Sequence, residues 1–246
     1  MNEPQSHIPK EVYLDFLGRT VEIHWSYHAV LMTFVWLFLV PLCILIIRFG
    51  KPKPTFYGLK RKVALYHSEW WWFSSHKWGL YLAMLLSVGG GIVAITVSKG
   101  FSGSVHSVFG ILAITLGAVQ VIAGWLRGKH GGKYYYTANP KDPSSWFGDH
   151  YNMTLRRRIF EAYHKNAGYF AGFCALAAVA SGLMQYPLPW LLAVVVTLFV
   201  LVLANTAVLD FKGFRHDSYK AAHGTDPEHP FNKERQDPLP PAPTRL

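Results

Sequence analysis

This chain of 246 residues contains little charge: Asp, Glu, Lys and Arg make up 15% of it, against about 25% in an ordinary soluble domain. Cysteine is rarer still, and both copies, Cys43 and Cys174, lie inside apolar runs, where we expect small buried side chains. No disulfide, CxxC redox motif or CxxCH attachment motif is therefore predicted. The chain also lacks a P-loop, a GxGxxG turn and a pattern typical of Ser-His-Asp catalysis, which excludes these common routes to enzymatic chemistry.

In place of charge, the chain carries five apolar stretches that charged segments separate. The stretches are Trp25–Ile47, Trp78–Ser98, Val105–Leu126, Ala167–Leu183 and Trp190–Leu209. Each has about 17–23 residues, which at ~1.5 Å per residue is enough to cross a hydrocarbon core of ~30 Å. The fourth is short, so its helix is expected to begin earlier, near Arg158. We predict an all-α fold, a transmembrane helical bundle of five spans in the lipid bilayer. No removable signal peptide is recognisable before Trp25, so the first helix is expected to act as a signal anchor.

The net charge of +10 is explained by where the basic residues lie. They are concentrated after the first stretch (Arg48, Lys51, Lys53, Lys60, Arg61, Lys62, Lys77) and after the third (Arg127, Lys129, Lys133, Lys141, Arg156, Arg157, Arg158). The link between the second and third stretches has Lys99 as its one charge, and the link Met184–Pro189 has none. This positive-inside asymmetry predicts an N-terminus outside and a C-terminus in the cytoplasm. It accounts for the basic charge without a nucleic-acid partner.

We predict an integral protein of the bacterial inner membrane whose chain has three parts. They are a periplasmic N-terminal segment 1–24, a transmembrane core 25–209 and a cytoplasmic polar tail 210–246. The run Trp70–Phe73 predicts an aromatic belt at headgroup level. The long loop 128–155 is rich in aromatic residues and is expected to pack against something, but its role is open. The tail after Gly213 is polar and ends in a proline-rich run, so we expect it to be disordered or extended.

One histidine opens each of the first four apolar stretches: His28, His76, His106 and His164. An imidazole in a lipid-embedded segment is costly, and it therefore marks a candidate functional site. Neighbouring spans are antiparallel. His28 and His106 are thus expected at one depth near the outer face, and His76 and His164 at one depth near the inner face.

Two imidazoles at one depth on facing helices can ligate the same iron from both sides of a haem. We therefore predict two noncovalent b-type haems, with His28 and His106 on the outer iron and His76 and His164 on the inner iron. A haem with two axial imidazoles has no open position, so it carries electrons rather than activating oxygen. The two irons are expected on the order of 20 Å apart, which makes a route for electrons across the bilayer.

Other interpretations of these residues stay open. A histidine at a helix end is often interfacial, and this is expected of His24, although its ring could also hydrogen-bond a haem propionate. Metal transport through a histidine-lined path would need acidic residues at mid-membrane, and the five stretches contain none. The recurrent glycines are expected in close helix packing. Gly110 and Gly168, each one turn after a predicted ligand, are expected to make room for a flat macrocycle as well.

Four motifs follow one another along the chain. They are His28-Ala-Val-Leu-Met with Trp36, Pro41 and Arg48; Trp72-Phe73 with His76 and a glycine-rich helix; His106 with Gly110 and Gln120; and Arg157-Arg158 with Tyr163-His164 and Gly168. In this order and spacing they resemble the cytochrome b561 family, in particular its five-helix core as found behind DOMON domains and in bacterial members. The resemblance covers about Trp25–Leu209. Ala29 stands where the family usually has glycine.

The resemblance implies that the first and third histidines hold one b-type haem and the second and fourth hold the other. It also implies an oxidoreductase that moves electrons across a membrane. Known members commonly take them from cytosolic ascorbate and pass them to an outside acceptor such as monodehydroascorbate or ferric iron. For this chain the donor is left open among a quinol, an ascorbate-like reductant and a reductase. The acceptor is expected on the periplasmic side, as a redox protein or a metal.

Three further questions are open at this level. The alternative function is a non-redox permease or a structural subunit whose histidines are interfacial. Arg48, Lys51, Arg157 and Arg158 are equally well interpreted as topology charges and as a site for a cytoplasmic anion or haem propionates. A homodimer and a place in a larger redox complex are both compatible with the sequence.

Overall fold

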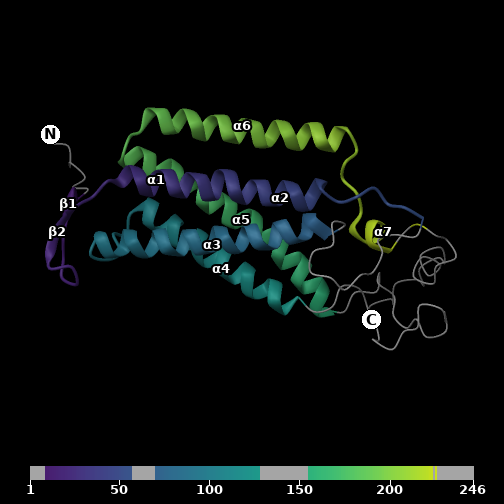
Figure 1. Ribbon diagram of the computed structural model, residues 1–246, viewed down its shortest axis with the longest axis horizontal. Helices are drawn as coiled ribbons and strands as arrows, with labels where there is room; N and C mark the ends of the chain where they lie inside the picture. The colour runs from purple at the N-terminus through teal and green to yellow at the C-terminus, as the bar shows by residue number, and fades with distance from the viewer. Residues whose placement is uncertain (1–8, 57–69, 128–154, 224, 226–246) are drawn as a thin grey trace, which may run out of the picture.

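The computed structural model describes residues 9–56, 70–127, 155–223 and 225. It contains five helices that are long and apolar enough to cross a membrane. The first is composite and consists of α1 (Trp25–Thr33), η1 (Phe34–Leu39) and α2 (Val40–Phe49). The others are α3 (Trp71–Val97), α4 (Val105–Leu126), α5 (Leu155–Gln185) and α6 (Pro189–Phe211). Successive spans run in opposite directions, so the starts of α1 and α4 lie at one end and the starts of α3 and α5 at the other (Figure 1).

The first span changes its winding at its centre. The π-helical segment η1 directly precedes α2, in which Pro41 is the second residue. Proline has no amide N–H and cannot make the usual bond to the carbonyl four residues earlier, and a wider turn before it absorbs that loss. Val35 and Trp36 lie in this wider turn, and both are buried.

Small side chains line the contacts among the first span, α3, α4 and α5. The buried cluster at the centre consists of Val35, Trp36, Ala83, Ala113, Ala171, Cys174 and Ala175. Lipid is as apolar as leucine, so helix association in a membrane depends on close packing, which small residues permit. Many larger apolar residues, such as Leu85, Ile92 and Trp125, are exposed on the surface of the bundle. The expectation that Cys43 and Cys174 are buried free thiols is confirmed.

The last span, α6, touches the rest of the protein along one narrow stripe. The stripe consists of Leu191, Val195, Leu198, Val202, Thr206 and Leu209, and the other residues of α6 are exposed. In the first half of α6, Val195 and Leu198 pack with Leu37 of η1 and Val179 of α5. Figure 1 shows α6 along the outside of the bundle, beside α1 and α2.

A β-hairpin, which the sequence analysis did not predict, precedes the first span. Strands β1 (Glu11–Leu14) and β2 (Arg19–Glu22) are antiparallel, and Gly18 in their turn has φ +61°, a conformation that glycine adopts without strain. The hairpin is joined to α1 by a hydrogen bond of 2.8 Å from the Trp25 indole N–H to the carbonyl oxygen of Pro9. It lies at the end of the molecule where α1 begins (Figure 1).

The segment after α6 is also more ordered than predicted. A short helix, α7 (Ser218–His223), forms where we expected disordered or extended chain. Just before it, the carbonyl oxygen of His216 accepts a hydrogen bond of 3.0 Å from the Lys51 ammonium. The amide of Thr225, just after it, donates to the carbonyl oxygens of Thr55 and Phe56 at 3.1 Å. These bonds fasten the segment to the chain that follows α2.

One predicted boundary needs correction, because helix α3 begins at Trp71 rather than at Trp78. Helix α5 begins at Leu155, which confirms the expected early start near Arg158. Trp72 is buried at 4% exposure and stacks on Trp70, so it packs inside the protein and is not part of an aromatic belt at the headgroups. Residues 128–154 of the predicted aromatic loop lie outside the described residues.

Candidate functional site

The structure brings His28 and His106 together at the end of the bundle where α1 and α4 begin, which is named the outer end after the predicted orientation; the opposite end is named the inner end. Their ring centroids are 6.0 Å apart and the ring planes are inclined by 83°. The Nδ1 atom of His106 lies 2.8 Å from the carbonyl oxygen of Ala178 in α5. A carbonyl oxygen can only accept, so Nδ1 must carry the proton and Nε2 keeps its lone pair. His106 therefore presents a ligand atom whose orientation the backbone of a third helix fixes.

His76 and His164 meet in the same way at the inner end. Their ring centroids are 6.4 Å apart with planes inclined by 77°. The Nδ1 atom of His76 lies 3.1 Å from the carbonyl oxygen of Cys43, so its Nε2 is also left with a free lone pair. His164 stacks on Phe160 with a centroid distance of 5.0 Å, and its Nδ1 is buried without a hydrogen-bond partner among the described residues.

Two contacts fix how far apart the pairs lie. The His28 ring hydrogen-bonds the backbone of Gly90, which follows His76 by fourteen positions in α3. Gln120, fourteen positions after His106 in α4, donates a hydrogen bond of 3.2 Å to the carbonyl oxygen of His164. Fourteen residues of helix span about 21 Å at ~1.5 Å per residue. Both contacts therefore place the two histidine pairs about 21 Å apart along the helices.

The space between the two pairs is filled by apolar side chains. Trp36 lies two turns after His28, and Met84 lies two turns after His76. Both meet at Gly117 of α4, where an added Cβ would lie 2.4 Å from the Met84 sulfur and 3.3 Å from the Trp36 ring. Gly117 is therefore required for close packing in the centre of the bundle, as the sequence analysis expected of its glycines.

The spacing of each pair fits a metal held between two imidazoles. With about 2 Å from metal to nitrogen and about 1 Å from nitrogen to ring centre, two such rings have centroids about 6 Å apart. A Cβ added to Gly110 would meet no atom within 4 Å, and one added to Gly168 would meet the Gln120 amide nitrogen at 3.8 Å. Open space thus lies beside Gly110, whereas Gly168 is in ordinary van der Waals contact with Gln120. Among the described residues no third metal-ligating side chain joins either pair of histidines.

Gly182 of α5 also contributes to the outer site, which the sequence analysis did not predict. A Cβ added to Gly182 would lie 2.8 Å from Nδ1 of His106 and 3.0 Å from Cε1. The ring of His106 therefore rests directly against the backbone of α5. The sequence offers no signal for this contact, because Gly182 is one of many span glycines and its partner is on another helix.

Basic side chains surround the inner pair. Arg48 forms an ion pair of 2.8 Å with Asp210, and Arg157 forms one of 3.0 Å with Glu161. The Arg127 guanidinium lies 4.7 Å from the centroid of the Phe73 ring. Burial lowers the pKa of Lys51 and that of Arg127. The side chain of Arg158 lies outside the described residues.

The chain has eight other histidines, among them His24, His67, His130 and His150. His24 is exposed at the start of α1, with its Nε2 4.0 Å from the Glu22 carboxylate, as an interfacial residue would be. His67, His130 and His150 lie outside the described residues. Comparison of the chain with protein-family models, with curated proteins and with solved structures finds no match in any of the three.

Proposed function

We propose that this chain is a membrane electron carrier of the cytochrome b561 type, with two noncovalent b-type haems. His28 and His106 would hold the outer haem, and His76 and His164 the inner one. The observation that carries the proposal is the pairing of the four rings, at 6.0 Å and 6.4 Å between centroids. Four histidines that were only interfacial would have no reason to meet in two pairs at this spacing.

Backbone carbonyl oxygens orient one histidine ring at each proposed haem site. The carbonyl oxygens of Ala178 and Cys43 accept from Nδ1 of His106 and His76, which leaves Nε2 of each ring free for a metal. Between two imidazoles, a haem supplies one-electron oxidation and reduction without an open position for substrate. The apolar packing of Trp36 and Met84 between the pairs excludes water from the centre of the bundle.

The proposal includes the orientation of the chain in the membrane and its electron donor and acceptor. The basic residues at the ends of α2 and α4 support a cytoplasmic inner end and a periplasmic hairpin. The donor would be a quinol, an ascorbate-like reductant or a reductase at the inner face, and the acceptor would lie outside. Arg127, Arg157 and Lys165 lie within electrostatic reach of His164, where they suit an anionic donor or the propionates of the inner haem.

The rival function is a permease or a structural subunit without redox activity. The visible spectrum of the purified protein, with pyridine haemochrome quantification, separates the two. We expect a sharp α-band on reduction and a stoichiometry of two haems per chain. A colourless preparation that takes up no haem on reconstitution would favour the rival.

A further inference from the structure

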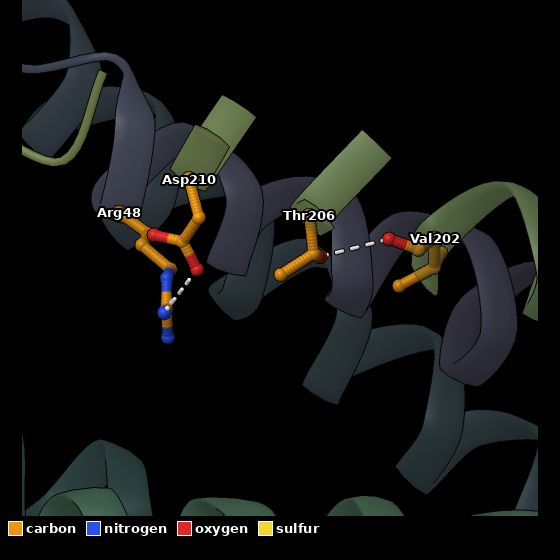
Figure 2. Close-up of polar contacts among 4 residues, drawn as sticks. All are labelled: Arg48, Val202, Thr206 and Asp210. Carbon is orange, nitrogen blue, oxygen red and sulfur yellow. Dashed lines mark hydrogen bonds and ion pairs between the residues drawn. The ribbon is translucent and has the colours of Figure 1, made fainter. Parts of the chain in front are cut away.

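A second binding feature lies at the inner ends of α2 and α6. Figure 2 shows Arg48 of α2 reaching Asp210 of α6, with Thr206 and Val202 one and two turns earlier on α6. The ion pair is 2.8 Å long, and its side chains are 30% and 37% exposed. The hydroxyl of Thr206 donates to the carbonyl oxygen of Val202, so it does not compete for either charge. The ion pair thus bridges two spans at the edge of the bundle.

The ion pair leaves much of the Arg48 guanidinium unused. The structure records one bond between the two side chains, from Nη2 to Oδ2, although a guanidinium has five N–H donors in a planar fork. The Nε atom is buried and has no hydrogen-bond partner among the described residues, so the donors left for an outside ligand are those of the two terminal Nη atoms. A second acceptor with several oxygen atoms, such as a phosphate group, would suit these donors.

Cations exceed carboxylates around Arg48. We call Arg48, Lys51, Lys165 and Arg215 the inner basic cluster, because Lys51 lies within electrostatic reach of the other three. Among the described residues, two carboxylates face the cluster, Asp210 and Asp217. Lys165 also reaches Glu161 at 3.8 Å, but that carboxylate is shared with Arg157 at 3.0 Å. The cluster therefore keeps positive charge that its own carboxylates do not balance.

The surroundings of the cluster suit a ligand with an apolar part. Arg48 and Asp210 are each the second-last residue of a span, which is the depth of the lipid headgroups. The next residue, Phe211, is 93% exposed, and Val208 is 48% exposed on the same helix end. A soluble anion would gain nothing from these apolar neighbours.

We propose that the inner basic cluster binds the phosphodiester headgroup of an anionic phospholipid, whose acyl chains lie against the exposed face of α6. The headgroup takes the free donors of Arg48 and the positive charge of Lys51. The lipid covers the helix that has the narrowest contact with the bundle, so it holds α6 in place. This site does not depend on haem binding.

Native mass spectrometry of the full chain in detergent tests the site, with phosphatidylglycerol and phosphatidylcholine of identical acyl chains as probes. We expect tighter binding of phosphatidylglycerol. Lys51→Gln and Arg48→Gln should each weaken its binding about fivefold, since one cation near an anionic lipid is worth about a factor of five. Lys53→Gln is the matched control, because it removes the same charge from an exposed position two residues away. It should leave binding within twofold.

Asp210→Asn separates a lipid site from a purely structural ion pair. It removes the competing carboxylate and frees Arg48, so phosphatidylglycerol should bind more tightly although the ion pair is lost. If the pair were only structural, Asp210→Asn and Arg48→Gln would lower stability alike without opposite effects on the lipid. Equal binding of the two lipids, or displacement of phosphatidylglycerol by millimolar inorganic phosphate, would overturn the proposal. Circular dichroism of each variant confirms that its helices are retained.

Discussion

Nδ1 of His106 and the carbonyl oxygen of Ala178 are 2.8 Å apart, although the residues lie 72 positions apart in the chain. The hydrogen bond fixes which nitrogen of His106 is protonated, and Gly182, one turn further along α5, lets the ring approach. Helix α5 therefore shapes the outer site without supplying a ligand candidate to it. If the site holds haem, as proposed, the haem spectrum reports on this contact between α5 and His106.

Gly182→Ala should disturb the outer site alone. The added methyl would lie 2.8 Å from Nδ1 of His106, and a ring in a packed interior moves away from such contact at a cost of about 1–3 kcal/mol. We expect altered absorption and redox potential for one of two haem components. Gly172→Ala, on the same helix with no atom within 4 Å of the new Cβ, is the control and should resemble the wild type. Equal spectra for both variants would contradict the contact.

Alanine replacements of the four histidines should behave as pairs. His28→Ala and His106→Ala should remove the same spectral component, because the two rings share one site. His76→Ala and His164→Ala should remove the other. Haem quantification and reduced-minus-oxidised spectra make the measurement. The pairing is wrong if His28→Ala and His76→Ala lose the same component while the other survives.

Gly79 and Cys43 provide a test of the packing between α2 and α3. A Cβ at position 79 would lie 2.4 Å from the Cys43 sulfur. Gly79→Ala should therefore lower the free energy of unfolding by about 1–3 kcal/mol, which thermal denaturation would measure. Cys43→Ala removes the sulfur, and the double variant should regain part of the loss. Gly89→Ala on the same helix meets no atom within 4 Å and serves as control. Additive losses in the double variant would show that the two positions do not touch.

The orientation can be tested by reporter fusions in a bacterial host. The distribution of lysine and arginine predicts a periplasmic link at residues 98–104 and a cytoplasmic C-terminus. Alkaline phosphatase should be active when fused within that link and inactive after Leu246. The reverse pattern would invert the assignment of the outer and inner histidine pairs.

The spans and the pairing of the histidines could be predicted because both depend on simple periodic quantities. Length and hydropathy define a span, and the alternation of antiparallel helices puts every second span-opening histidine at one end. His28 with His106, and His76 with His164, follow from counting alone.

The contacts between helices could not be predicted from the sequence. All faces of α6 are apolar, so nothing distinguishes the stripe through Val195 and Val202 that touches the bundle. Trp72 was assigned to a belt because aromatic residues near a span end are usually interfacial, yet its helix begins earlier and turns it inward. The hairpin did leave a signal in Gly18 between two short alternating segments, which the polar composition of residues 1–24 obscured.

The most direct test of the account is electron transfer across a sealed membrane. The haem-loaded protein is reconstituted in liposomes with reductant inside and an impermeant acceptor outside, and acceptor reduction is followed optically. The orientation of the inserted chains is checked by protease access. We predict that the wild type reduces the acceptor and that His28→Ala and His164→Ala do not, because each variant removes one of the two haem sites on the electron path. Acceptor reduction that persists in both variants, or is absent from the haem-loaded wild type, would contradict the account.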